Sequence, residues 1–437
     1  MTEQNGTQQS TDEGTGSRWL DGRRAFLTLL AVGSGGCLRS LQSSTDGEST
    51  TQSSERPPQS GSPTETQPTG GTDPGDRTAA EPTGIETEWS VDANIRSTRS
   101  GSMETFAHVS TADDIVAVTR DGVIGLSAAD GSQRWRRFQN RSIQPRIQAL
   151  PGSNSGVAIA DQSGSVYAVS ASDGRTQWQT DLGIGSHFTA VRGGEELIVA
   201  GTTTRAGEFA DPFVIAGLDV QSGTPNWRVT DDAFADSSGL SFEGGLSEPA
   251  NGRILVSLAN SVVAISVTEG RLLGDLDEIA QGDPSMYNAG FEPNVAAAQD
   301  GSIYVPNYRP YAVDVTAEYA LSWTADPFES ATTSTAVRGD DVAFGARDNG
   351  VYLLDRTDGT RRWRTNTDGN VVTTPIIDGT TVWAGTRSGT VYLLRRADGT
   401  LVGERSVDRD IHSTTKSGDG VIVSGGEGIH RVAPITA

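Results

Sequence analysis

Few residues in this sequence have the type and spacing that catalysis or metal binding requires. The 437 residues include one cysteine and four histidines. Three of the histidines, His108, His187 and His412, fall near the starts of expected β-strands, and ligands from distant strands could converge on a metal ion. Their positions within the strands differ, however, and no carboxylate accompanies them at a fixed spacing. We therefore expect ordinary hydrogen-bonded histidines, with no metal, no cofactor and no catalytic residue.

The cysteine, Cys37, lies in a distinctive local sequence. As the sole cysteine it cannot form an intrachain disulfide. Small residues precede it at 33–36, which resembles the lipobox of a lipoprotein, although Ser34 stands where leucine is usual. We expect Cys37 to be a lipid attachment site, and the alternative is a buried thiol.

Arg23 and Arg24 precede a short apolar run, residues 25–32. The arginine pair resembles a twin-arginine export signal, and the run is much shorter than the roughly 20 residues that span a bilayer. Residues 1–37 are thus predicted to be a signal peptide with the lipobox-like cysteine at its end. This places the protein on the outer face of the cytoplasmic membrane, which it contacts through a lipid anchor only.

Residues 38–84 consist mainly of Ser, Thr, Gly, Pro, Gln and Glu. Such a composition buries too little apolar surface to offset the entropy lost on ordering. We expect a disordered tether, and the alternative is a segment that folds when it contacts a partner.

Residues 85–437 repeat one pattern: an apolar strand, a turn with an acidic residue and a glycine, and a tryptophan. Ala168–Trp178, AVSASDGRTQW, is a clear copy, and two further copies carry glycine in place of tryptophan, Gly274 and Gly403. Equivalent positions recur every 39 to 50 residues. Periods of this length are typical of four-stranded propeller blades. The sequence therefore predicts an all-β propeller of four-stranded antiparallel blades.

The two ends of the repeat region complement each other. After Gly403 the chain supplies three more strands, 411–416, 421–425 and 428–432, and the missing fourth strand is found at Ile85–Val91, which contains Trp89. Pairing the first strand with the last blade removes an exposed sheet edge. This arrangement predicts eight blades, with seven as the alternative because the unit at 311–323 is degenerate.

The repeat is similar to that of the PQQ-like (quinoprotein alcohol dehydrogenase-like) β-propellers, over about residues 85–432. In that family an Ala-x-Asp-x-x-Thr-Gly-x-x-x-Trp motif closes each blade. The resemblance implies that one set of residues docks between neighbouring blades: Trp89, Trp135, Trp178, Trp227, Trp323 and Trp363.

The same family contains dehydrogenases that use pyrroloquinoline quinone, and non-catalytic lipoproteins of bacterial outer-membrane assembly. The dehydrogenases carry an adjacent cysteine pair, a calcium ion held by carboxylates and a catalytic aspartate. The adjacent cysteines are absent here, and the other groups map onto no matching positions. The resemblance therefore favours a protein that is not an enzyme.

Charge indicates the habitat and excludes one class of partner. The formal net charge is −22, and Lys416 is the only lysine. An acidic, lysine-poor surface is typical of proteins from very salty environments, where salt screens the self-repulsion. Because no basic stripe is present, nucleic acid is not an expected partner. Together with the export signal, this composition suggests a haloarchaeal envelope lipoprotein.

Three connections are longer than the others: 202–212, 230–245 and 275–293. In a four-stranded meander all three emerge on one face. Apolar residues in long loops on a rigid scaffold are a usual place for recognition. The candidate binding-face residues are therefore Phe209, Phe213, Phe234, Phe242, Met286, Tyr287 and Phe291. The alternative, given equal weight, is that these loops pack on each other as lids.

These observations predict a lipid-anchored, extracytoplasmic β-propeller that acts as a non-enzymatic scaffold for an envelope protein or a small ligand. Two alternatives remain open. One is a quinone-dependent oxidoreductase with a site in the channel, and the other is an envelope assembly factor resembling the bacterial lipoproteins.

Overall fold

The computed structural model describes residues 81–95, 108–150, 156–203, 213–230, 242–258, 261–275, 295–306, 309–316, 320–326, 331–426 and 428–436. They all belong to one compact unit, Gly70–Ala437. Arg23, Arg24, Cys37 and the predicted tether up to residue 80 lie outside the described residues. Within the described part, no helix is long and apolar enough to cross a membrane.

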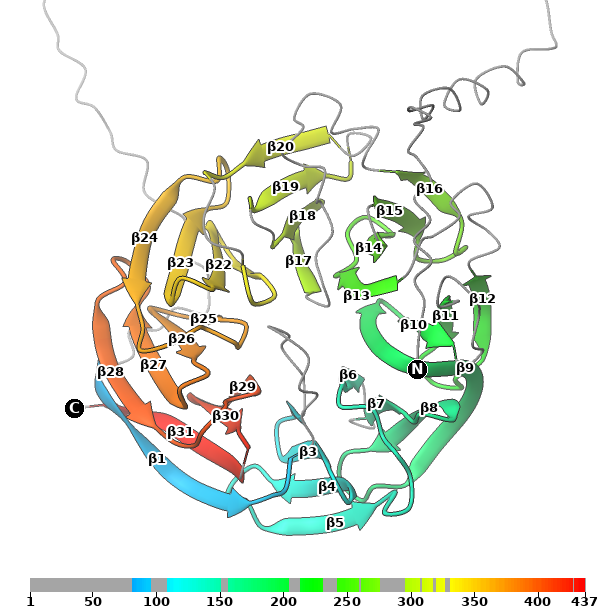
Figure 1. The fold of residues 1–437 in the computed structure, drawn as a ribbon, viewed down its shortest axis with the longest axis horizontal. Helices are drawn as coiled ribbons and strands as arrows, with labels where there is room; N and C mark the ends of the chain where they lie inside the picture. The colour runs from blue at the N-terminus through cyan, green and yellow to red at the C-terminus, as the bar shows by residue number, and fades with distance from the viewer. Residues whose placement is uncertain are drawn as a thin grey trace, which may run out of the picture. The chain divides into compact units, whose positions relative to one another are not determined.

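Three sheets are simple antiparallel meanders of four strands. Each of these three blades begins with a short strand near the axis and ends with an outer strand (Figure 1). The first comprises β2 (His108–Ser110), β3 (Asp114–Thr119), β4 (Gly122–Ser127) and β5 (Gln133–Arg137). The second comprises β21 (Ala336–Arg338), β22 (Asp341–Ala346), β23 (Gly350–Asp355) and β24 (Arg361–Asn366), and the third comprises β25 (Ile376–Asp378), β26 (Thr381–Gly385), β27 (Thr390–Arg395) and β28 (Leu401–Ser406).

A seven-stranded sheet contains two blades that share one strand. The shared strand β9 pairs with β8 through its first part and with β10 through its last part, so it is the outer strand of one blade and the inner strand of the next. The sheet comprises β6 (Gln148–Leu150), β7 (Gly156–Ala160), β8 (Gly164–Ser170), β9 (Thr176–Gly193), β10 (Glu196–Thr203), β11 (Phe213–Asp219) and β12 (Pro225–Thr230).

An eight-stranded sheet joins two further blades through their inner strands. β13 and β17 pair in parallel, with Leu246 opposite Val295 and Ser247 opposite Ala296. The sheet comprises β13 (Phe242–Ser247), β14 (Arg253–Leu258), β15 (Ser261–Ser266), β16 (Leu272–Asp275), β17 (Val295–Gln299), β18 (Ser302–Val305), β19 (Tyr311–Asp314) and β20 (Ala320–Thr324).

The last sheet closes the ring with both ends of the repeat region. β1 (Pro82–Asp92) pairs antiparallel with β31 (Gly428–Thr436), which continues to β30 (Gly420–Ser424) and β29 (Ser413–Ser417). Trp89 lies opposite Arg431 in this register. The closure predicted from Ile85–Val91 is therefore confirmed. With β9 counted in both of its blades, the described strands form eight groups of four, and Figure 1 shows them arranged around a central axis. The propeller fold is confirmed.

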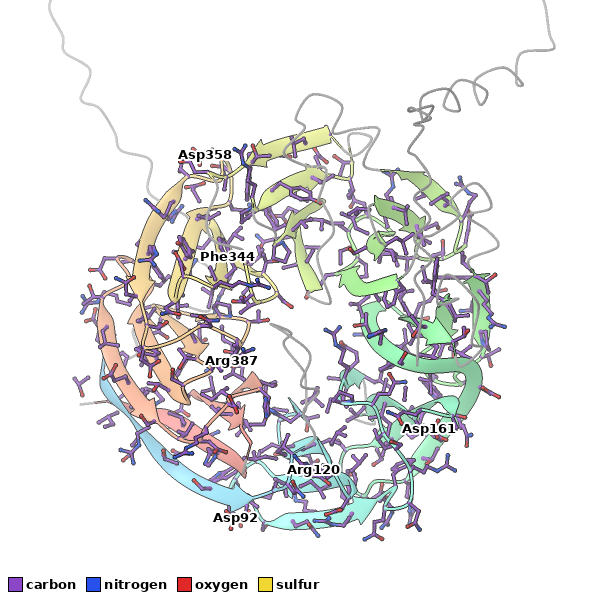
Figure 2. All side chains as sticks on the ribbon, in the orientation of Figure 1. Asp92, Arg120, Asp161, Phe344, Asp358 and Arg387 are labelled. Carbon is purple, nitrogen blue, oxygen red and sulfur yellow. The ribbon has the colours of Figure 1, made fainter. Side chains whose placement is uncertain are left out.

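The apolar core lies between adjacent blades. Every residue of β3 and β4 is buried, because the second and third strands of a blade contact neighbouring blades on both faces, which favours continuous apolar runs over alternation. Val116 and Val118 of β3, for example, share one apolar cluster with Ile159 of β7 and Val169 of β8. Figure 2 shows the side chains filling the spaces between the blades.

Candidate functional site

Five of the repeat tryptophans each connect the end of one blade to the blade that follows it. The indole Nε1 of Trp135, at the end of one blade, donates a hydrogen bond of 2.7 Å to the carbonyl oxygen of Ala171 in the next blade. Four other indoles donate to the carbonyl at the same position of the following blade: Trp178 to Val220, Trp227 to Val267, Trp323 to Arg356 and Trp363 to Arg396. Trp89 is partly buried, and its Nε1 has no partner within the described residues.

The histidines occupy separate environments. His108 is fully buried, where its Nδ1 lies 2.9 Å from Ser424 Oγ and its Nε2 lies 2.9 Å from Thr415 Oγ1. Burial lowers the pKa of His108 to about 4, so the ring is neutral near pH 7. Burial also lowers the pKa of His412, whereas His187 lies within β9 with a φ of 52°. Among the described residues, no group of three or more His, Cys, Asp or Glu could hold a metal ion.

The structure corrects two of the predicted binding-face residues. Phe213 begins β11 and Phe242 begins β13, and both are buried in one apolar cluster with Ile198 and Ile254. They are therefore core residues, because the strands extend further toward the connections than the sequence pattern indicated. The other candidates lie outside the described residues: Phe209, Phe234, Met286, Tyr287 and Phe291.

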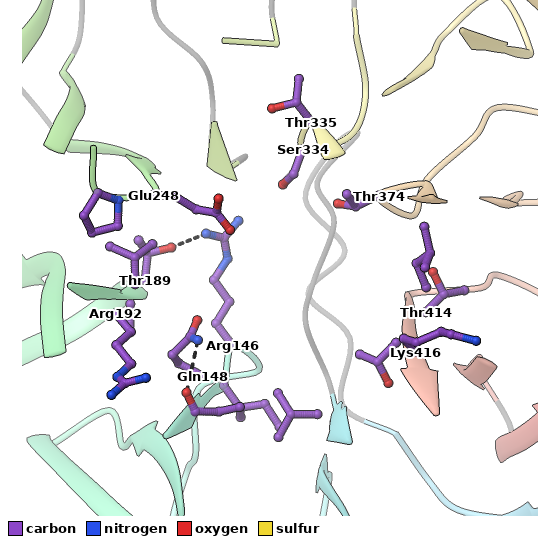
Figure 3. Close-up of a pocket in the computed structure, with 18 residues that line it drawn as sticks. Arg146, Gln148, Thr189, Arg192, Glu248, Ser334, Thr335, Thr374, Thr414 and Lys416 are labelled. Atoms are coloured by element: carbon purple, nitrogen blue, oxygen red, sulfur yellow. Dashed lines mark hydrogen bonds between the residues drawn. The ribbon is translucent and has the colours of Figure 1, made fainter. Parts of the chain in front are cut away.

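A pocket of about 560 Å³ lies on the axis, where the inner strands of several blades meet. Its wall is rich in hydroxyl and amide groups that come from different repeats (Figure 3): Gln148, Thr189, Ser334, Thr335, Thr374, Thr414 and Thr415. Sequence reasoning did not select these residues. A signal was present, because the pairs Thr333-Ser334, Thr373-Thr374 and Ser413-Thr414 recur at one position of their repeats.

Three of the charged side chains that line the same pocket have polar or charged partners. Arg146 donates from Nη1 to Thr189 Oγ1. Glu248 accepts a hydrogen bond of 3.0 Å from the backbone N–H of Ala298, and the surrounding protein raises the pKa of its carboxyl group. The ammonium of Lys416 lies 2.7 Å from Asp378 Oδ2. The described part of the wall is therefore polar and carries charged groups of both signs.

Comparison with known proteins identifies the family. The family model described as outer membrane protein assembly factor BamB matches residues 119–365 and 259–428, which together make up more than half of the chain. The chain belongs to this family. The recognition of a PQQ-like repeat propeller is thus confirmed. No curated protein sequence matches the chain.

Solved structures share the fold of this BamB-like propeller. BamB from Moraxella catarrhalis has a TM-score of 0.58 at 19% identity, over 80% of this chain and 99% of that one. The computationally designed protein Ika8 has a TM-score of 0.59 at 13% identity, over 79% of this chain and 100% of that one. The quinohemoprotein alcohol dehydrogenase ADHIIG from Pseudomonas putida HK5 has a TM-score of 0.56 at 11% identity, over 82% of this chain and 77% of that one.

The dehydrogenase neighbour raises the question of whether the axial pocket fits a quinone held by calcium. Calcium takes six to eight oxygen ligands, usually with several carboxylates. Of the described residues that line the pocket, Glu248 is the one carboxylate, and its Oε2 accepts a backbone N–H. The chain's single cysteine, Cys37, lies far outside the repeats in sequence. The donor set does not fit a calcium–quinone site.

Proposed function

We propose that this BamB-like propeller is an exported, lipid-anchored scaffold that binds another protein of the cell envelope and catalyses no reaction. The proposal rests on the lining of the axial pocket, because the fold itself is shared by enzymes and assembly factors. Among the described residues, its wall of Thr and Ser hydroxyls with one carboxylate, Glu248, lacks the groups that quinone chemistry requires. Because function depends on the site and not on the fold, this wall favours binding over catalysis.

The family supports a protein partner, since its description names an assembly factor. Propellers suit this role because each blade is held by its own strands and by its two neighbours, which leaves the connecting loops free to vary. The proposed binding face is the one from which the connections 204–212, 231–241 and 276–294 emerge. The face is chosen from their length and from Phe209, Phe234, Met286, Tyr287 and Phe291.

The test is a pull-down of the tethered protein from its own membranes in high salt. In the test variant, residues 231–241 and 276–294 are replaced by short Asp-Gly turns. We expect this variant to keep the melting transition of the wild type and to lose the proteins that copurify with it. A matched control changes an exposed turn on the opposite edge of another blade, Asp398→Ser, and should retain every partner.

Two results would contradict the proposal in different ways. If the loop-shortened protein keeps its partners, the binding face is wrong. If the purified protein takes up pyrroloquinoline quinone with calcium and reduces a dye in the presence of an alcohol or a sugar, the chain is an oxidoreductase and the scaffold proposal fails.

A further inference from the structure

We propose that Asn140 is a site of N-linked glycosylation. Asn140, Arg141 and Ser142 form an Asn-x-Ser acceptor sequence in the connection between β5 and β6. This sequence marks a glycosylation acceptor only in an exported protein and only where the asparagine is accessible. The inference thus rests on the export in the proposed function and adds a modification to it.

The local structure holds this connection as a fixed turn at the edge of the blade. The N–H of Arg141 donates to the carbonyl oxygen of Phe138 over 3.1 Å, and Phe138 has a φ of 60°. The Phe138 ring meets the ring of Tyr167 edge-on, with 5.3 Å between centroids. The turn therefore packs on β8 through its first residue.

Arg141 fastens the other side of the turn. Its Nη1 lies 2.8 Å from Asp161 Oδ2, and its guanidinium lies over the Tyr167 ring at 5.2 Å from the centroid. Burial alone would raise the pKa of Asp161, but hydrogen bonds from Ser163, Tyr167, Ser165 and Arg141 outweigh burial and keep this pKa low. Asp161, labelled in Figure 2, is therefore ionised at neutral pH and keeps Arg141 in place.

Asn140 lies between these two anchored residues and is itself exposed. Its side-chain amide has no hydrogen-bond partner within the described part of the chain, so a transferase can approach it without breaking an interaction of the fold. Ser142 is also exposed, while its carbonyl oxygen accepts the N–H of Gln162 over 2.9 Å. A glycosylated Asn140 thus fits the folded propeller without rearrangement.

No other asparagine of the described residues is followed at the second position by Ser or Thr. The sequence contains one further acceptor pattern, Asn5-Gly6-Thr7, which precedes the predicted export arginines. In the exported protein the structure therefore assigns a single modified position.

The reaction requires a glycan carried on a lipid phosphate as co-substrate. The amide nitrogen of Asn140 forms a bond to the anomeric carbon of the glycan, and the bond from that carbon to the phosphate oxygen breaks. The amide loses one proton, and the lipid phosphate leaves. No oxidant or reductant takes part. The attached glycan adds hydrated bulk at the β5–β6 connection, so a protein partner would bind over other blades.

The test is mass spectrometry of the full chain purified from the cell that naturally makes it. We expect a glycan mass on the peptide containing Asn140, and its loss in Asn140→Gln and in Ser142→Ala. Ser142→Thr should retain it, because threonine also completes the acceptor sequence. Unchanged melting transitions in all three variants would show that the loss of the glycan is not a loss of folding.

Two outcomes overturn the proposal and can be told apart. An exported chain, lacking its first residues, that carries an unmodified Asn140 overturns the glycosylation proposal alone. A chain that stays in the cytoplasm with residues 1–36 intact overturns the export on which both this inference and the proposed function rest.

Discussion

The indole of Trp135 lies directly on Gly174 of the following blade: a Cβ atom added to Gly174 would be 2.5 Å from Trp135 Cε3. Each other docking tryptophan has its own turn glycine one blade further on: Trp89 with Gly131, Trp178 with Gly223, Trp227 with Gly270, Trp323 with Gly359 and Trp363 with Gly399. Each tryptophan and the glycine that it covers thus form one joint between two blades, and two neighbouring repeats are needed to make it.

This relationship explains the two repeats that carry glycine at the tryptophan position. The blade after Gly274 has no glycine in its last turn, which reads Thr316-Ala317-Glu318-Tyr319. The blade after Gly403 has no such turn, because its last two strands are β31 and β1, the two ends of the repeat region. The backbone of β1 lies there instead, since a Cβ at Gly403 would be 3.0 Å from Gly84 Cα.

The first prediction separates backbone strain from crowding at this joint. Gly174 and Gly183 have φ values of 72° and 71°, and a Cβ would meet nothing within 4 Å at Gly183. Gly183→Ala should therefore cost about 1–2 kcal/mol from the left-handed backbone alone. Gly174→Ala should cost about 1–3 kcal/mol more, because the methyl group displaces Trp135. Urea unfolding at one fixed salt concentration measures both changes in the free energy of unfolding. Equal changes for the two substitutions would contradict the packing of Trp135 on Gly174.

A second prediction concerns the indole itself. Trp178 is buried and donates a hydrogen bond of 2.8 Å to Val220. Trp178→Ala should therefore lower the free energy of unfolding by about 3–5 kcal/mol, through lost burial and an unfilled cavity. Leu401→Ala, at a side chain that is 48% exposed on β28, is the control and should change it by less than about 1 kcal/mol. A cost at Trp178 as small as the control would contradict the docking role.

A third prediction concerns ring closure. Deleting Pro82–Asp92 removes β1, its pairing with β31 and the ion pair between Glu88 and Arg431, and leaves β31 as an open edge. The shortened protein should melt far below the parent and aggregate more. Deleting residues 38–80 should leave the melting temperature unchanged. Calorimetry and light scattering in the same salt provide the measurement, and two deletions of equal effect would refute the assignment of β1.

The fourth prediction is a pH dependence due to His108. Its pKa is about 4 in the folded protein, against 6.5 for an unperturbed histidine, so the unfolded chain binds more protons between these values. Stability from this residue is complete above about pH 6.5 and falls as the pH drops toward 4, by up to about 3 kcal/mol. His108→Gln should be less stable at pH 7 and should lose this part of the pH dependence. An unchanged profile in the variant would show that another group is responsible.

The fifth prediction tests anchoring. With Arg23→Lys and Arg24→Lys together, the precursor should remain in the cytoplasm. Cys37→Ser should release the protein from the membrane or block its processing. Cell fractionation and mass spectrometry of the amino terminus distinguish these results. Normal export of the double variant would exclude the twin-arginine route, and a lipid-modified Cys37→Ser protein would exclude this attachment site.

The parts of the fold that local signals specify were predictable from sequence. Apolar runs such as Gly156–Ala160 and Leu197–Ala200 are the second strands β7 and β10, because burial on both faces leaves a continuous hydrophobic pattern. The closing strand β1 could be predicted because Trp89 fits the spacing of the repeat.

Other features depend on contacts between repeats, so no sequence pattern within one repeat indicates them. The parallel pairing of β13 with β17 joins residues about 50 positions apart. β9 continues from one blade into the next past Gly183, a residue whose positive φ would normally indicate a turn. The axial pocket is likewise assembled from Thr and Ser side chains of separate repeats, so their recurrence becomes visible only when the repeats are compared with one another.

The position of Lys416 has a practical consequence for mapping partners. It is the only lysine of the 437 residues, and its side chain is 33% exposed beside the axial pocket, where it pairs with Asp378. Amine-directed cross-linkers therefore cannot capture a protein bound at the rim of the blades through any lysine of this chain. A fluorescent label on Lys416 would lie beside the axial pocket, while reagents that activate carboxylates can act at many more positions, because the chain has 56 Asp and Glu residues.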